Sequence, residues 1–138
     1  MTYRTENFQE HEISCRCGCG LVVFHPGFLG ELQAVRTELA LPMHLRSACR
    51  CARHNDTPAM EGGAGGHRRS LHVGDREQHP GQKGCLAVDI ETLDGVMRGR
   101  LFEIAWRRKW SIGWNGRLKF LHLDLRTLIG MKQVTFDY

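Results

Sequence analysis

Several features that would place a chain in a specialised class are missing from this sequence. It contains no run of about 18 apolar residues, so we expect no membrane insertion. Its first residues, MTYRTENFQEHEIS, are polar and lack the apolar region of a secretory signal, so synthesis in the cytoplasm is expected. It also lacks a basic stripe interleaved with aromatic residues, so the pattern predicts no nucleic-acid partner.

Paired C-x-x-C motifs, the usual pattern of a structural zinc site, are absent as well. The six cysteines form two C-x-C groups and one isolated position: Cys15, Cys17, Cys19, Cys49, Cys51 and Cys85. A disulfide framework is disfavoured because no export signal is predicted. Reduced thiols, buried or half-buried, are the favoured interpretation. A thiolate zinc site built from the C-x-C pairs is the alternative.

What is present indicates one folded domain over residues 1–138. The chain is 41% hydrophobic and 25% charged, which suffices for a single core and disfavours global disorder. Residues 1–14 are expected to be an irregular segment. The net charge of +4 fits an anionic partner such as cell wall or nucleic acid, but is also ordinary for a folded protein.

Local patterns predict an α+β fold class. Apolar residues at helical spacing predict helices over 27–41 and 92–109. Strands are predicted over 43–48, 86–90, 110–114 and 119–125, with a hairpin turn at Asn115-Gly116. The polar stretch 53–69 is a long loop, of the kind that is either functional or disordered. No βαβ rhythm is evident, so the strands are expected to be antiparallel.

The predicted strand 119–125 carries a candidate site. Its leucines alternate with His122 and Asp124, so these two side chains share the face opposite the leucines. A second stretch, SLHVGDREQHPGQKGCLAVDI (70–90), also contains histidine and aspartate. Catalytic zinc sites use three ligands of this type and leave a fourth position open. We therefore predict a Zn²⁺ site formed by His72, Asp89 and His122.

Four segments together resemble a known family. They are SACRCARHN (47–55), EGGAGGHRRSLH (61–72), GCLAVDI (84–90) and IGWNGRLKFLHLDLR (112–126). They resemble the zinc peptidases that cut bacterial peptidoglycan, namely the D-Ala-D-Ala carboxypeptidases and related murein endopeptidases, which share a fold with the hedgehog signalling domain. The resemblance covers residues 15–126 and implies a small antiparallel sheet with flanking helices and one Zn²⁺ per chain.

The resemblance also implies the three metal ligands. The family motif S-x-H corresponds to Ser70 and His72, and its A-x-D ends at Asp89. Its H-x-D corresponds to His122 and Asp124. Relative to the family, residues 75–83 look like an inserted loop, and Cys85 stands where a glycine is expected. His79 in that loop is a spare candidate ligand.

Further roles follow from the same resemblance. Arg50 is predicted to hold a substrate carboxylate or carbonyl oxygen, because a guanidinium matches such groups bidentately. Ser70 and Trp114 are predicted to contact the substrate, with His67 as a second possible pocket wall. Asn55 belongs to the same motif as Arg50 and is expected to brace its loop.

The position of the general base departs from the pattern of the family that the sequence resembles. Many family members place it three residues, or as an imidazole two residues, before the last histidine ligand. Here these positions are Lys119 and Phe120, and neither side chain serves as that base. Asp124 is then either the general base or a carboxylate that orients an imidazole. Glu91 and Glu103 are further possible contributors.

The leading prediction is therefore a zinc-dependent peptidase that hydrolyses peptidoglycan peptides by metal-activated water, as a carboxypeptidase or an endopeptidase. Such an enzyme acts on the cell wall once it is released, as a phage-encoded lytic enzyme does. One alternative is a metal-binding assembly module of the same fold without turnover. Another is a cysteine-zinc module that binds nucleic acid. The sequence does not define the oligomeric state.

Overall fold

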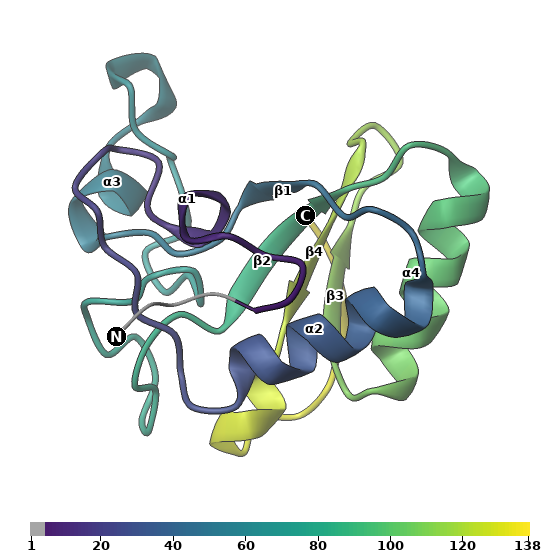
Figure 1. Cartoon of the computed structure of the whole chain (residues 1–138). Helices are drawn as coiled ribbons and strands as arrows, with labels where there is room; N and C mark the ends of the chain where they lie inside the picture. Colours follow the sequence, from purple (N-terminus) through teal and green to yellow (C-terminus); the bar gives the residue numbers. More distant parts are fainter. Residues whose placement is uncertain (1–4) are drawn as a thin grey trace.

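The fold is built around one central sheet, which a computed structural model describes over residues 5–138 (Figure 1). Its strand order is β1-β2-β4-β3-β5. The first four strands pair antiparallel, whereas β5 lies parallel to β3. The strands are β1 (Leu45–Ser47), β2 (Ala87–Glu91), β3 (Ser111–Trp114), β4 (Phe120–Asp124) and β5 (Thr135–Asp137).

Two long and two short helices accompany the sheet: α1 (Glu10–Ile13), α2 (Phe28–Leu39), α3 (Ala52–Asp56) and α4 (Gly95–Arg107). Helix α4 begins at Asp94, whose side chain accepts a hydrogen bond from the Met97 backbone N–H at 2.8 Å. Helix α2 ends at Ala40, which adopts a left-handed conformation shortly before Pro42. No helix in the described part of the chain is long and apolar enough to cross a membrane.

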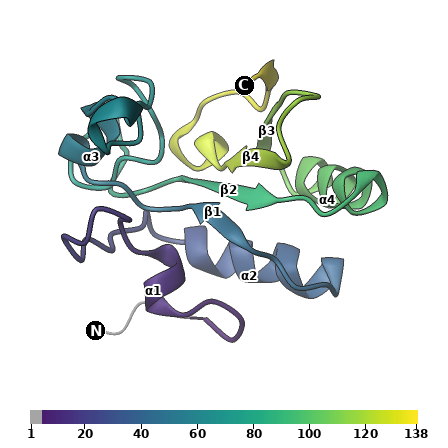
Figure 2. The ribbon, with the colours of Figure 1, turned by 90° about the horizontal axis from the view of Figure 1, so that it is seen from above.

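The core lies between the long helices and one face of the sheet. The apolar side chains that α2 and α4 turn toward the sheet, such as Leu32 and Leu101, are buried. The residues of β2 and β4 that face them are buried too, such as Val88, Leu121 and Leu123. Trp110 packs edge-on against Phe28 with ring centroids 5.3 Å apart. Figure 2 places α2 on one side of β1 and β2, and places α3 and the C-terminal end on the other. The second side carries the candidate site.

The predicted α+β class is confirmed, and most predicted elements occur with ends shifted by a few residues. The sheet is mixed, because the short β5 returns parallel to β3; the expectation of a purely antiparallel sheet is corrected here. Residues 1–14 are not irregular throughout. Gln9 and Glu12 form a capping box that starts the one-turn helix α1, while residues 1–4 lie outside the described range.

Candidate metal centre and active site

The three predicted metal ligands come together on the face of the sheet opposite the helices. Asp89 on β2 is the direct cross-strand partner of His122 on β4. Asp89 Oδ1 lies 3.1 Å from His122 Nδ1 and 3.3 Å from His72 Nε2. One ligand atom from each of the three residues lies within 4.8 Å of the others, and all three side chains are buried. The structure thus assembles the predicted triad.

His72 is held by backbone contacts in the loop before β2. Its carbonyl accepts a hydrogen bond from the Arg50 N–H at 2.8 Å, and its own N–H donates to Ser70 Oγ at 3.2 Å. His72 Nδ1 lies 2.7 Å from the Ala48 carbonyl oxygen, which only accepts, so Nδ1 donates. Burial lowers the pKa of His72, which favours the neutral ring. Nε2 therefore presents a lone pair toward Asp89.

His122 is oriented in a comparable way by a carboxylate. Its Nε2 lies 2.9 Å from Asp124 Oδ2, which leaves Nδ1 facing Asp89. Burial by itself lowers the pKa of His122, but the hydrogen bonds to Asp124 and Asp89 reverse this and raise it. Asp124 is fully buried and also accepts two hydrogen bonds from the Arg126 guanidinium, at 2.8 and 2.7 Å.

These residues fit a Zn²⁺ ion. Two imidazole nitrogens and one carboxylate oxygen form the donor set of many catalytic zinc sites. A neutral imidazole lone pair and a carboxylate oxygen repel each other unless a cation or a proton lies between them. His72 Nε2 and Asp89 Oδ1 face each other at 3.3 Å, so a bound cation would relieve this repulsion. Each histidine also bonds a protein oxygen through its other ring nitrogen, as metal-bound histidines commonly do.

The second oxygen of Asp89 contacts two donors. Arg50 Nη2 and the Tyr138 hydroxyl both lie 3.4 Å from Asp89 Oδ2. Burial raises the pKa of Asp89, but His72 and His122 outweigh it, so the pKa lies well below its ordinary value. Tyr138 stacks on His122 with ring centroids 4.8 Å apart. Asp89 is thus held as a carboxylate with one oxygen facing the histidines.

Arg50 is braced by its own loop. Its Nε donates to Ser47 Oγ at 3.0 Å, and its Nη1 donates to Asn55 Oδ1 at 3.2 Å. Gly66 passes close to this pair: a Cβ there would lie 2.2 Å from Asn55 Oδ1 and 2.8 Å from Arg50 Nη1. The long polar stretch that contains Gly66 is therefore folded against the site.

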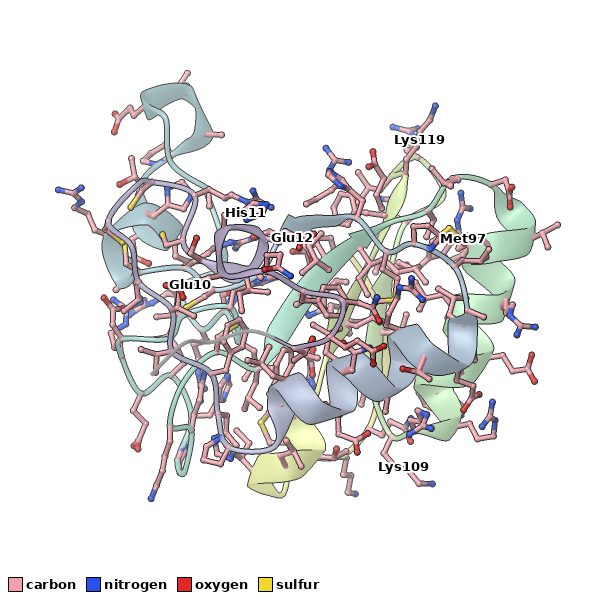
Figure 3. All side chains as sticks on the ribbon, viewed as in Figure 1. Glu10, His11, Glu12, Met97, Lys109 and Lys119 are labelled. Carbon is pink, nitrogen blue, oxygen red and sulfur yellow. The ribbon has the colours of Figure 1, made fainter. Side chains whose placement is uncertain are left out.

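A cavity of about 600 Å³ opens beside the triad. Arg50 and Ser70 line it as predicted, and so does His67. Trp114 does not line it: its half-exposed side chain lies at the end of β3. Lys119 is exposed, and Figure 3 shows it at the β3–β4 turn with its side chain pointing outward. The substrate-contact roles of Arg50, Ser70 and Trp114 stay predictions.

The cavity is rich in arginine. Arg50, Arg69 and Arg126 line it, and of these Arg50 is paired with Asp89 and Arg126 with Asp124. Asp89 is the one carboxylate among the described lining residues. His79 also lines the cavity, but both its ring nitrogens contact Arg69, at 3.2 and 3.0 Å, so it is not part of the triad. Guanidinium groups that line a cavity can bind an anionic ligand.

Two aromatic residues of the site were not predicted. Phe136 and Tyr138 line the cavity and contact His122, because β5 pairs with β3 beside β4. Gly113 permits this approach: a Cβ there would lie 2.7 Å from the Phe136 ring. Their spacing of two residues, typical of one strand face, was the available signal.

The predicted insertion 75–83 is tied to the loop that carries Arg50. Asp75 Oδ1 accepts a hydrogen bond from the Ala52 N–H at 2.8 Å, and Arg76 forms an ion pair with Asp56. The buried Gln82 side chain donates to the carbonyls of Val73 and Gly84. The longer spacing between His72 and Asp89 is therefore compatible with the triad.

Comparison with protein families identifies the class. The family model described as Peptidase M15 matches residues 6–124, which is most of the chain. The chain therefore belongs to the M15 peptidase family, a family of zinc-dependent metallopeptidases. Searches of curated proteins and of solved structures gave no significant match.

Proposed function

We propose that this protein is a zinc-dependent peptidase that hydrolyses peptide bonds in bacterial peptidoglycan, as a carboxypeptidase or an endopeptidase. The observation that carries the proposal is the convergence of His72 Nε2, His122 Nδ1 and Asp89 Oδ1 beside an arginine-lined cavity, whose wall includes Asp89 and His122. Family membership supports the metallopeptidase class. When bound by these ligands, Zn²⁺ supplies Lewis-acid activation of water and of the scissile carbonyl.

The arginines are suited to the substrate. Peptidoglycan stem peptides carry free carboxylates, and a guanidinium binds a carboxylate through two parallel hydrogen bonds. Arg50 lies closest to the triad, since it contacts Asp89 directly. We assign to Arg50 the binding of a substrate carboxylate or carbonyl oxygen next to the scissile bond. Arg69 and Arg126 place two further guanidinium groups along the cavity, that of Arg126 paired with Asp124.

Asp124 is assigned an orienting role. It is fully buried, it does not line the cavity, and its oxygens accept hydrogen bonds from His122 and Arg126. A base must reach the water that it deprotonates, directly or through one other water. A carboxylate that bonds the far nitrogen of a metal-bound histidine fixes the ring and its proton. Of the two roles open from the sequence, this geometry favours the second.

The test is hydrolysis of defined substrates. Purified zinc-loaded protein is incubated with muropeptides that contain D-Ala-D-Ala ends, L-Ala-D-Glu bonds or cross-bridges, and the products are identified by mass spectrometry. We expect cleavage of one bond type, lost in Asp89→Ala and retained in the exposed control Lys119→Ala. No cleavage of any bond type by the zinc-loaded protein would reject the proposal.

One observation favours a second candidate, a metal-binding module without turnover. The described cavity lining offers no carboxylate besides Asp89, which is itself a proposed ligand. A carboxylate general base is therefore not in place among these residues. This candidate predicts zinc binding and retention on peptidoglycan, with no products from any muropeptide. The same incubation, followed by a peptidoglycan pull-down, separates the two candidates.

A further inference from the structure

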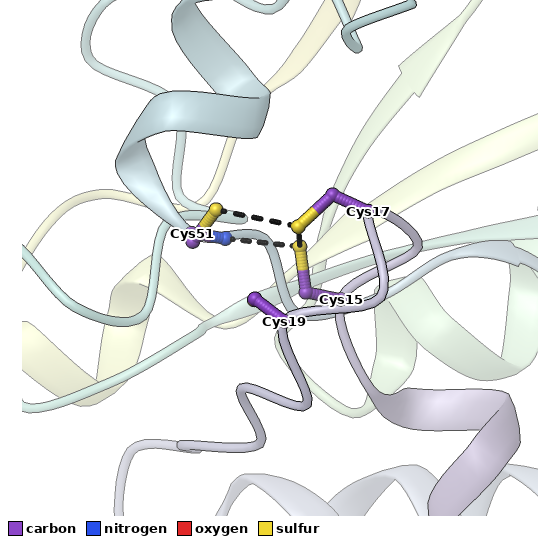
Figure 4. A group of neighbouring side chains, drawn as sticks. All are labelled: Cys15, Cys17, Cys19 and Cys51. Carbon is purple, nitrogen blue, oxygen red and sulfur yellow. Dashed lines mark hydrogen bonds between the residues drawn. The ribbon is translucent and has the colours of Figure 1, made fainter.

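Four of the six cysteines lie together, away from the proposed active site. Cys15, Cys17 and Cys19 belong to the loop after α1, and Cys51 stands at the start of α3 (Figure 4). Their four sulfur atoms all lie within 4.8 Å of one another. We propose that these four cysteines bind one structural Zn²⁺ ion that joins the N-terminal segment to α3.

The sulfur spacing matches a single tetrahedral ion. Four ligands at about 2.3 Å from a zinc ion are separated from one another by about 3.8 Å. Cys15 Sγ and Cys17 Sγ are 3.5 Å apart, and Cys17 Sγ and Cys51 Sγ are 3.8 Å apart. A disulfide requires a sulfur separation of about 2.05 Å. The cysteines are free thiols in this structure, and these two separations are those of a mononuclear tetrathiolate site.

The sulfurs also receive backbone hydrogen bonds. The Cys51 N–H donates to Cys15 Sγ at 3.3 Å, and the His54 N–H donates to Cys51 Sγ at 3.3 Å. Burial raises the pKa of Cys15 and of Cys51, and it outweighs the backbone donors, each of which by itself lowers the pKa of the thiol that it contacts. A bound cation would offset this cost of burying a thiolate. Zinc is the metal that tetrahedral thiolate sites prefer, and four protein ligands form a closed structural site. Larger iron–sulfur clusters place several metal atoms between the cysteines and need more room.

The proposed ion would brace the segment that carries Arg50. Cys51 follows Arg50 directly, and Cys49 N–H donates to the Ile13 carbonyl oxygen at 3.2 Å. Arg16, in the loop that carries Cys15 and Cys17, donates to the Leu45 carbonyl oxygen on β1 at 2.8 Å. The N-terminal segment is therefore attached to the chain on both sides of the arginine. The ion would add metal–thiolate bonds between the N-terminal loop and the segment that follows Arg50.

The test is zinc content and ligand identity. Wild type, His122→Ala, Cys51→Ser and Cys85→Ala are purified under reducing conditions and studied by elemental analysis and zinc X-ray absorption. We expect two zinc ions in wild type and one, with sulfur neighbours only, in His122→Ala. Cys51→Ser should lose the sulfur-bound ion. Cys85→Ala removes a buried thiol outside the cluster and should keep both.

The result that overturns the proposal is zinc without sulfur neighbours in wild type, or no zinc in a folded His122→Ala protein. Iron in place of zinc in these preparations would also overturn it. X-ray absorption distinguishes the two sites by the atoms that surround the zinc. A wild-type protein that holds only sulfur-bound zinc would therefore count against the proposed peptidase site and not against the four-cysteine site.

A second measurement does not depend on the folding of a variant. Cys17 and Cys19 are exposed and should react rapidly with an alkylating reagent if they are free thiols. In the zinc-loaded wild type we expect them to be protected and to become reactive when a strong chelator is added. Rapid alkylation of the zinc-loaded protein, or disulfides found by intact mass, would reject the structural ion.

Discussion

The two residue clusters that could hold a metal differ in chemistry, burial and surroundings. The triad of His72, Asp89 and His122 is buried, offers nitrogen and oxygen, and borders a cavity. The four-cysteine cluster offers only sulfur, includes two exposed residues, and contributes no residue to that cavity. A site for chemistry needs a position open to substrate, whereas a site for stability uses all its ligands on the ion.

The clusters also differ in how the chain supplies them. Three of the cysteines lie within five residues of one loop, so a single short loop presents them. The triad draws on a loop and on two paired strands, in which Asp89 and His122 are direct neighbours. Ligands on strands are held by the sheet even without a metal. The loop cysteines have no such support, so the metal is expected to matter more for structure there.

The largest effect is expected from removing a triad ligand. His122→Ala should reduce muropeptide hydrolysis by at least about 10³-fold, because the metal contributes several kcal/mol of transition-state stabilisation. The comparison predicts that the same variant keeps its sulfur-bound zinc and its fold. Product analysis, zinc content and circular dichroism check this, with Lys119→Ala as control. If His122→Ala unfolded and lost all its zinc, the triad would be needed for stability as well, and the two sites would not differ in role as we expect.

A smaller loss of activity is expected from changing Asp124, which orients His122 of the triad. Asp124→Asn should weaken zinc binding at the triad and lower activity by about 10- to 100-fold, because an orienting carboxylate is lost. Zinc affinity and kcat are measured with Asp137→Asn, an exposed carboxylate on β5, as control. If Asp124 were the general base, kcat would fall while zinc affinity stayed unchanged, and the acidic limb of the pH profile would disappear.

Crowding the Arg50 loop should act on substrate binding. Gly66→Ala would force a Cβ against Asn55 and Arg50, and overpacking of this kind costs about 1–3 kcal/mol. We expect a raised KM, with both zinc ions retained. Gly116→Ala is the matched control, because a Cβ at that hairpin glycine meets no atom within 4 Å. An unchanged KM in Gly66→Ala would argue against Arg50 as a substrate contact.

The smallest effect is expected at Tyr138. Tyr138→Phe removes one hydrogen bond to Asp89 Oδ2, worth about 0.5–1.5 kcal/mol, so activity should fall about 2- to 10-fold. Burial, followed by the nearby charge of Asp89, raises the pKa of Tyr138 to about 12. A raised tyrosine pKa favours the neutral phenol, which stays a donor at neutral pH. The alkaline limb of the activity profile should therefore be the same in both proteins; its loss in the variant would contradict this role.

The sequence by itself was sufficient for the two long helices, for the first four strands and for the chemical type of the triad, but not for α1, α3 and β5. Helix α2 and strand β4 were predictable because their apolar residues repeat at periods of 3.6 and 2, which are local properties. The alternation in β4 placed His122 and Asp124 away from the leucines, and this is confirmed because Leu121 and Leu123 belong to the core whereas His122 lines the cavity and bonds Asp124. The family was predictable as well, because its motifs are short and contiguous, and the match over residues 6–124 confirms it.

Only the tertiary structure decided which residues meet. The pairing of Asp89 with His122 depends on strand register, and the role of β5 depends on a parallel return that no local pattern indicates. The cysteines show this most clearly. The absence of C-x-x-C pairs and of an export signal favoured reduced thiols, and all six cysteines are free. Only folding brings Cys51 to the loop of Cys15, Cys17 and Cys19 from more than thirty residues away. Spacing along a chain determines local geometry, but a metal site is defined by distances in space.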